Sequence, residues 1–160
     1  MEARPATAAD DAAIWEIITP PIAAGEVFAL PRGWGAAEAI GYWRGPGKAT
    51  FVVEQDGEIV GTYYIQPNQL GGGAHVANAG YATRTGCEGR GIAGFMCANS
   101  KEEARRQGYR AMQFNFVLAS NERAVALWQR HGFAIVGTLP EVFDHPRLGL
   151  VDAYVMYAAL

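Results

Sequence analysis

A chain of 160 residues, half of them apolar, is long enough to bury one sizeable core and too short to divide comfortably into two. Its formal net charge of -3 supplies no broad basic field, which argues against a nucleic acid or an anionic membrane as the main partner. We therefore expect one domain over residues 1–160, in which local features hold any anionic ligand.

Several classes of protein are disfavoured by the finer composition. No apolar stretch reaches the roughly 18 residues that a membrane helix needs, and residues 1–5 lack the basic and apolar segments of a secretory signal. The two cysteines, Cys87 and Cys97, fit a reducing compartment, so we expect a cytoplasmic protein. The histidines are scattered and no CxxC occurs, so no metal site is expected.

The first third of the chain predicts a short strand near residues 2–5 and then a helix. Thr7 is the expected N-cap of this helix, which we expect to stop at Pro20-Pro21. Residues 22–47 are rich in Gly and Pro with scattered aromatic side chains, and a short helix is expected at 36–44. This region is typical of a lid.

The remainder alternates between strands and helices. Residues 50–54 and 59–65 form an expected antiparallel hairpin, because Asp56-Gly57 between them is a strong turn signal. A third strand is expected at 74–82, followed by a helix from Gly91 to Gly108. The later expected elements are a strand at 111–117, a helix at 120–131 and strands at 133–139 and 150–157. This order predicts an α/β fold with a mixed sheet covered by helices.

A glycine-rich turn, Glu88 to Ala93, falls where a predicted strand ends and a predicted helix begins. Small residues let the backbone approach a ligand closely, and free N–H groups at the helix start would point at one anion. A pyrophosphate is the natural occupant. The alternative is a tight turn that starts a helix without binding anything, and the sequence leaves both open.

This turn resembles the acetyl-CoA-binding motif of the GNAT (GCN5-related) N-acetyltransferase superfamily, whose pattern is Gln or Arg, two residues, Gly, one residue, then Gly or Ala. Glu88, Gly91 and Ala93 fall on these positions. Glu88 departs from the pattern, because a carboxylate repels a diphosphate unless it points away or is paired, for which Arg84 and Arg90 are candidates. The CoA contacts that the resemblance implies here are Ala82, Thr83, Glu88, Gly89, Arg90, Gly91, Ile92 and Ala93.

A second segment resembles the GNAT pattern N-x-x-A-x-x-L-Y-x-x-x-G-F. It implies that Asn121 contacts the pantetheine arm of CoA, with Ala124 nearby, whereas the alternative makes Asn121 only a helix cap. Trp128 stands where many members carry a tyrosine that protonates the departing thiolate. Since an indole N–H does not ionise, we expect Trp128 to pack as a wall beside the CoA arm and not to protonate the thiolate. The matching positions are Asn121, Ala124, Leu127, Gly132 and Phe133.

Two asparagines lie within predicted central strands. Strand alternation puts Asn115 on one face with Val117, opposite Phe114 and Phe116. A buried amide is costly without partners, so Asn115 is expected to line a cavity, and the same argument applies to Asn78. The alternative, that backbone groups satisfy both asparagines inside the fold, stays open.

The three asparagines at positions 78, 115 and 121 resemble, in order and spacing, three functional asparagines of the GNAT branch that includes the yeast azetidine-2-carboxylate (proline-analogue) N-acetyltransferase. The resemblance implies that Asn78 and Asn115 are catalytic and bind a small amino or imino acid. Glu26 and Phe28 of the lid are added as acceptor contacts, and Glu26 is the first carboxylate to test as a base.

The resemblance as a whole implies a GNAT acyl-CoA N-acyltransferase fold, in which the sheet splays between strands near Tyr81 and Asn115. Acetyl-CoA is the implied co-substrate, without a metal, and a small-molecule amine would attack it directly in a ternary complex. The alternatives are acetylation of a protein N-terminus or lysine, and a CoA-binding sensor without turnover. A homodimer is an expectation that rests on the resemblance alone.

Overall fold

The computed structural model describes all 160 residues and contains one seven-stranded sheet in the order β1-β2-β3-β4-β5-β7-β6. The strands are β1 (Glu2–Pro5), β2 (Ala49–Gln55), β3 (Glu58–Pro67), β4 (Val76–Thr83), β5 (Ala111–Leu118), β6 (Ala134–His145) and β7 (Gly149–Ala159). The helices are α1 (Asp11–Ala24), α2 (Ala36–Trp43), α3 (Ile92–Arg106) and α4 (Glu122–Arg130), with short 3-10 turns at Ala8–Asp10 and Gly71–Gly73. The predicted order of elements is confirmed. No helix has the length and apolar character needed to cross a membrane.

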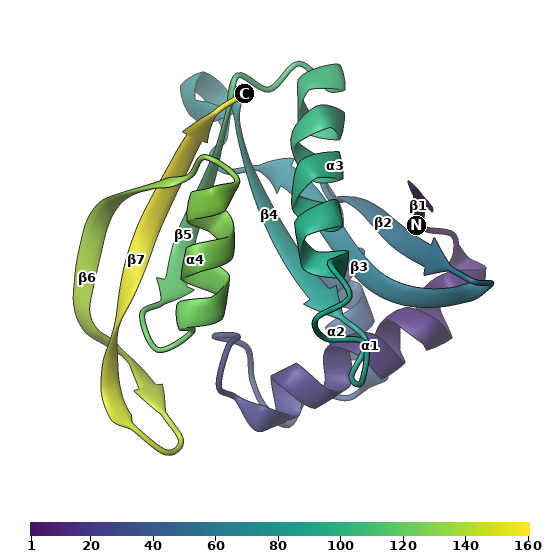
Figure 1. The fold of residues 1–160 in the computed structure, drawn as a ribbon, viewed down its shortest axis with the longest axis horizontal. Coiled ribbons are helices and arrows are strands. Elements are labelled where there is room, and N and C mark those ends of the chain that lie inside the picture. Colours follow the sequence, from purple (N-terminus) through teal and green to yellow (C-terminus); the bar gives the residue numbers. More distant parts are fainter.

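The sheet opens between its two central strands. All neighbouring strands are antiparallel except β4 and β5, which are parallel and pair only at Val76 with Ala111 and at Ala77 with Met112. Beyond these positions the two strands diverge, and Figure 1 shows them as a V with its apex near the C-terminus. The expected splayed, mixed sheet is therefore confirmed.

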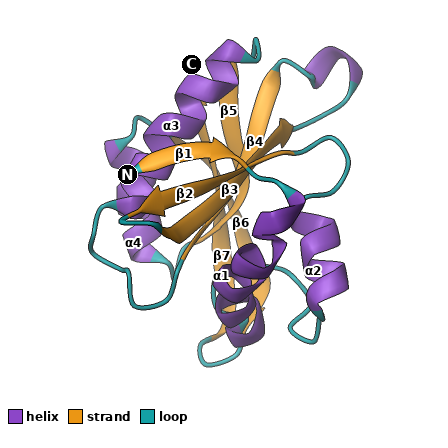
Figure 2. Ribbon diagram, turned by 90° about the vertical axis from the view of Figure 1, so that its right-hand side faces the viewer, coloured by secondary structure: helices purple, strands orange, loops and turns teal.

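Helices cover both faces of the sheet (Figure 2). On the face that we call the α3 face, α3 and α4 pack over a core that includes Tyr63, Met96 and Trp128. On the opposite, α1 face, α1 and α2 pack over a second core that includes Tyr64 and Trp43. Adjacent strand residues point to opposite faces, which is why Tyr63 and Tyr64 belong to different cores.

The β2–β3 hairpin confirms the turn prediction. Asp56 has φ 55° and Gly57 has φ 82°, so both central residues adopt the left-handed conformation of a two-residue hairpin turn. The register then aligns Thr50 with Tyr64 and Phe51 with Tyr63.

Helix α1 does not end where the sequence predicted. The expectation of a stop at Pro20-Pro21 is wrong, because α1 includes both prolines and continues to Ala24. Its buried isoleucine stripe continues past the prolines to Ile22, so tertiary packing outweighs the local cost of two missing amide donors. The helix ends at Gly25, whose φ of 65° suits a left-handed C-cap.

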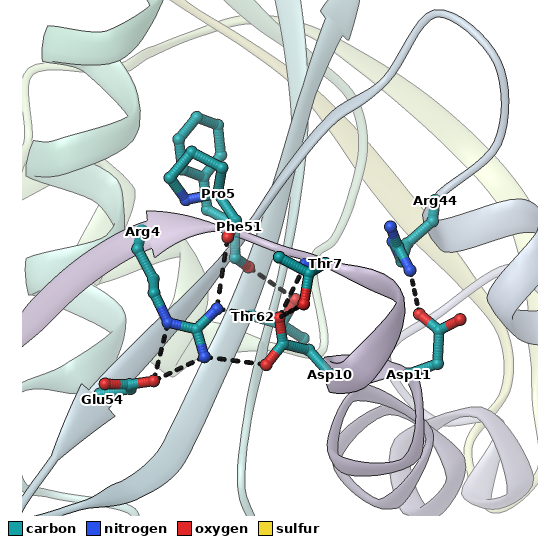
Figure 3. A network of polar contacts seen from close by, with 9 residues as sticks. All are labelled: Arg4, Pro5, Thr7, Asp10, Asp11, Arg44, Phe51, Glu54 and Thr62. Atoms are coloured by element: carbon teal, nitrogen blue, oxygen red, sulfur yellow. Dashed lines mark hydrogen bonds and ion pairs between the residues drawn. The ribbon is translucent and has the colours of Figure 1, made fainter.

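A polar network fixes the start of α1 to the edge of the sheet (Figure 3). Arg4 donates to both carboxylate oxygens of Asp10 at 2.8 Å and to Glu54 at 2.8 Å. The Asp10 carboxylate also accepts from the amide of Thr7 at 2.7 Å, which completes a capping box. Thr7 is thus the N-cap of the 3-10 turn before α1, whereas the N-cap of α1 itself is Asp10 and not Thr7 as expected. The hydrogen bonds from Arg4 hold the pKa of Asp10 well below its usual range, although burial opposes the shift.

Strand β5 departs from simple alternation. The pairing of β5 with β7 shifts between Phe114 and Val117, so an irregularity interrupts the strand there. Val117 returns to the same core as Phe114, and its expected place on the face of Asn115 is wrong. Asn115 and Phe116 are exposed at the irregularity instead.

Candidate active site

A pocket of about 1000 Å³ passes through the opening between β4 and β5. Its lining on the α3 face includes Ile92, Leu127 and Trp128. On the α1 face the lining includes Tyr64 and Trp43. A ligand on one face of the sheet can therefore meet a second ligand that arrives from the other.

The edge of β4 along this opening carries free backbone groups. The amide of Arg84 donates to Val60 O at 2.9 Å, so even-numbered residues of β4 bond to β3 and odd-numbered residues turn toward β5. The amides of Ala79, Tyr81 and Thr83 consequently face the opening, where β5 has already diverged. They are donors available to a ligand that lies along the strand.

Ala82, expected among these donors, has a different environment. It pairs with Thr62, so its amide lies in the β3 ladder, and its side chain is buried in the α1-face core. The structure does not place it in the pocket lining, whereas its neighbour Thr83 does line the pocket.

The glycine turn presents the first backbone amides of α3. Gly89 and Gly91 both have φ 79°, a conformation that glycine adopts without strain, and Gly91 is the N-cap of α3. No side chain caps α3, and the first helical bond runs from Phe95 N to Gly91 O at 3.0 Å. The three preceding amides, those of Ile92, Ala93 and Gly94, lack a helical partner and belong to residues of the pocket lining. This geometry fits a diphosphate.

The Glu88 carboxylate turns back onto its own loop, where Oε2 accepts from the amide of Gly86 at 2.9 Å. Glu88 lines the pocket, as expected, but neither Arg84 nor Arg90 pairs with it, and Arg90 is outside the lining. Both arginines are held by other carboxylates: Glu16 lies 3.1 Å from Arg84, and Asp56 lies 3.8 Å from Arg90.

At the start of α4, Asn121 caps the helix and also lies in the pocket lining. Its Oδ1 accepts from the amide of Ala124 at 3.3 Å and so caps the helix, while both residues line the pocket. Trp128 is almost buried, with its ring centroid 4.9 Å from that of Tyr81 and 5.1 Å from that of Phe114. It forms an aromatic wall of the pocket on the α3 face.

Asn78 is held at the point where β4 and β5 separate. Its Nδ2 donates to the backbone oxygen of Gln113 at 3.0 Å, and its Oδ1 accepts from Gln66 Nε2 at 3.3 Å. The alternative in which backbone groups satisfy this asparagine is thus partly correct. One N–H and one lone pair of Asn78 remain for a ligand.

Asn115 is held in the same way on the other side of the opening. Its Nδ2 donates to Asn68 Oδ1 at 2.7 Å, and its Oδ1 accepts from Gln113 Nε2 at 2.9 Å. Asn78 and Asn115 both line the pocket. The supporting amides of Gln66, Asn68 and Gln113 were missed from the sequence, because a neutral amide becomes informative only when strand register places it beside another.

The connection between α1 and α2 supplies one of the two expected contacts. Phe28 lines the pocket and packs edge-on against Trp43, with ring centroids 5.9 Å apart. Glu26 does not line the pocket, because its carboxylate pairs with Arg147 at 2.8 Å in the β6–β7 connection. The structure therefore does not bring Glu26 to the site as a base.

The α1-face side of the pocket holds no carboxylate. Tyr42 and Tyr64, which the sequence analysis did not single out, line it beside Asn78. Burial raises the pKa of Tyr64 far above its usual range, so its hydroxyl stays protonated. No group of three or more His, Cys, Asp or Glu residues is placed to hold a metal ion.

Comparison with known proteins gives a consistent result. The model of the Acetyltransferase (GNAT) family matches residues 14–133. The structure of a GCN5-related N-acetyltransferase from Kribbella flavida is 38% identical, covers 99% of this chain and 97% of its own, and has a TM-score of 0.93. The yncA structure from Salmonella typhimurium, solved with its cofactor acetyl-CoA, covers 100% of this chain and 94% of its own at 21% identity and a TM-score of 0.86, a likeness of fold alone.

Among curated proteins, the N-acetyltransferase aca1 of Schizosaccharomyces pombe is 31% identical over 114 residues, which are 69% of this chain. The chain spans about half, 53%, of the length of that relative. Because the family model covers three quarters of the chain and a relative matches along almost all of it, the chain belongs to the GNAT family of acetyltransferases.

Proposed function

We propose that the protein transfers the acetyl group of acetyl-CoA to the amine of a small molecule, with an amino or imino acid as the favoured acceptor. Use of acetyl-CoA for N-acetylation is supported at the level of the family. The acceptor class rests on one observation, the pair of asparagines held beside the opening of the sheet. The 160 residues would act as one acetyltransferase domain of the cytoplasm.

Acetyl-CoA would supply an activated acetyl thioester, and the chain offers partners along its length. The free amides of Ile92, Ala93 and Gly94 suit the diphosphate, and the dipole of α3 adds to their effect. The amides of Tyr81 and Thr83 at the β4 edge suit the pantetheine arm and the thioester carbonyl. On the other side, Asn121 and Trp128 would confine the arm, together with Ala124. Gly89 and Gly91 let the backbone approach, and the Glu88 carboxylate stays bonded to its own loop.

The acceptor would bind on the α1 face. Each asparagine has a fixed orientation and retains one donor and one acceptor. Asn78 and Asn115 together can thus meet a carboxylate with N–H groups and an amine with oxygens, and Phe28 covers an apolar body. This pairing agrees with the resemblance to the azetidine-2-carboxylate branch.

Direct attack in a ternary complex is the mechanism that we infer. The continuous pocket lets both substrates occupy the opening at once, which favours alignment of the two reacting atoms. The amine lone pair forms the new C–N bond, the C–S bond breaks, and the proton lost from nitrogen ends on the thiolate through water. A thiolate whose conjugate acid has a pKa of about 8.5 leaves readily without a protein acid at the position of Trp128.

Release of free thiol tests the function. Wild-type protein would be mixed with acetyl-CoA and a panel of free amino and imino acids, a peptide with a free N-terminus, and a peptide with a single lysine. We expect thiol release with members of the first group. Release with the peptides alone would replace the acceptor by a protein, and binding of acetyl-CoA without release above background would indicate a sensor, a function favoured by the absence of an acceptor-side carboxylate.

A homodimer through β6 is our proposal for the assembly. This strand lies at one edge of the sheet, so its outer backbone groups are free to pair. Its exposed apolar side chains include Ile135, Val136, Leu139 and Val142. Pairing of two such edges would cover a surface that is costly to leave in water.

A further inference from the structure

A glycine in the middle of β4 makes room for a tyrosine from β3. Gly80 pairs with Tyr64, and a Cβ at Gly80 would lie 2.6 Å from Cε1, 2.7 Å from Cζ and 2.8 Å from Oη of that ring. The outer half of the Tyr64 ring therefore lies directly on the backbone of Gly80. A side chain at residue 80 would displace it, which explains a glycine inside a strand.

The Tyr64 hydroxyl has few partners for a buried group. Tyr64 is 6% exposed, and its Oη has a single protein partner, Tyr42 Oη at 3.3 Å. In either direction of that hydrogen bond, Tyr64 keeps at least one free lone pair. Since buried hydroxyls are normally well satisfied, an under-used hydroxyl at the wall of a pocket points to a ligand.

The ring is held in place from several sides. The ring of Trp43 packs edge-on against Tyr64 with centroids 5.0 Å apart. Lys48 Nζ lies 3.4 Å from the ring centroid of Tyr42 and 4.4 Å from that of Tyr64, a cation–π arrangement with both. The hydroxyl is thus fixed before any ligand arrives.

The Tyr64 hydroxyl lies beside both the β4 edge proposed for acetyl-CoA and the α1-face side proposed for the acceptor. Residue 80 lies between Ala79 and Tyr81, whose amides face the opening of the sheet. Gly80 also shares the α1 face with Asn78, two residues away on the same strand. An amine that enters from the α1 face toward the β4 edge would pass the Tyr64 hydroxyl.

We propose that Tyr64 Oη accepts a hydrogen bond from the attacking amine and holds its nitrogen over the open edge of β4, a role that rests on the proposed function. Tyr64 neither gains nor loses a proton. The nitrogen lone pair forms the C–N bond, the C–S bond breaks, and the N–H proton passes through water to the thiolate. Tyr64 is then a substrate-contacting residue of the acceptor site.

Tyr64→Phe tests this role against a matched control. Tyr63→Phe removes the neighbouring hydroxyl on the opposite face, which donates to Asn99 in α3. Loss of one neutral hydrogen bond should lower kcat/KM for the acceptor about tenfold in Tyr64→Phe. Titration calorimetry should give the same Kd for acetyl-CoA in wild type and both variants, and Tyr63→Phe should keep its acceptor kcat/KM within about twofold.

A second variant reaches the same ring without removing the hydroxyl. Gly80→Ala should displace Tyr64 and lower acceptor kcat/KM to the same extent. In the Tyr64→Phe background the substitution should add little, because the ring no longer carries the contact. An unchanged acceptor kcat/KM in Tyr64→Phe, or a loss of acetyl-CoA affinity as large as the loss of kcat/KM, would overturn the role of Tyr64 and leave the proposed function standing. A wild type that binds acetyl-CoA but acetylates no amine would overturn the proposed function and this role with it.

Discussion

Replacement of Asn115 by alanine provides the most direct test of the acceptor site. Asn115 is exposed, and its protein partners Asn68 and Gln113 can turn to water when it is lost, so the fold should be barely affected. The variant loses one hydrogen bond to the acceptor's amine and one to its carboxylate. With about 0.5–1.5 kcal/mol for the neutral bond and about 1.5–3 kcal/mol for the charged one, the expected loss is about 2–4.5 kcal/mol. This corresponds to roughly 30- to 2,000-fold in kcat/KM for the acceptor.

Steady-state kinetics and calorimetry together show whether Asn115 binds the acceptor. Acceptor kcat/KM would be measured by thiol release, and the Kd of acetyl-CoA would be measured on the same preparations. The Kd should stay within about twofold, because Asn115 lies on the side of β5 away from the diphosphate turn. Asn68→Ala removes only one support of Asn115 and should cost less than about tenfold in kcat/KM. Equal losses in kcat/KM and in acetyl-CoA affinity for Asn115→Ala would refute the assignment.

Three further predictions concern the turn, the α1 anchor and the edge of the sheet. Gly91→Ala should lower stability by about 1–2 kcal/mol, because φ is positive there, and should also weaken acetyl-CoA binding. Gly108→Ala, at φ 88° and remote from the pocket, should lower stability alone. Differential scanning calorimetry measures the stability of each variant, and titration calorimetry measures its affinity for acetyl-CoA. The pKa of Asp10 is lowered in the folded state, so its contribution to stability is present above its unfolded pKa of about 3.9 and is lost as the pH falls from there through the folded pKa. Urea unfolding between pH 7 and pH 3 should therefore show a free energy of unfolding that falls in acid, and Asp10→Asn should reduce that fall. Val136→Lys should convert a homodimer to a monomer in sedimentation velocity while Val136→Thr keeps it, and a wild-type monomer would contradict the β6 interface.

Local signals in the sequence were sufficient for most of the fold. Asp56-Gly57 predicted the hairpin, and the switch from strand to helical periodicity at Gly91 placed α3. The end of α1 was misplaced because burial of Ile22 is a tertiary effect that prolines do not reveal. The side to which Val117 points was also misplaced, since an irregularity in a strand has no reliable sequence signature.

The candidate site could likewise be predicted from the sequence only in part. Contiguous motifs identified the lining residues near Gly91 and Asn121, because their spacing along the chain carries the information. The position of Glu26 could not be foreseen, since its partner Arg147 is 121 residues away. Tyr64 was missed because its relation to Gly80 exists only across two paired strands.

The brief pairing of β4 with β5 has a consequence for how the molecule responds to its ligand. The sheet consists of two half-sheets, β1–β4 and β5–β7, which are joined by two aligned positions and by side-chain hydrogen bonds of Asn78 and Asn115. A thioester carrier that spans the opening would contact both halves and connect them for as long as it is bound. By mass action it would then raise the melting temperature and slow amide exchange most in the strands beside the opening, so the reactant would complete the scaffold that positions it.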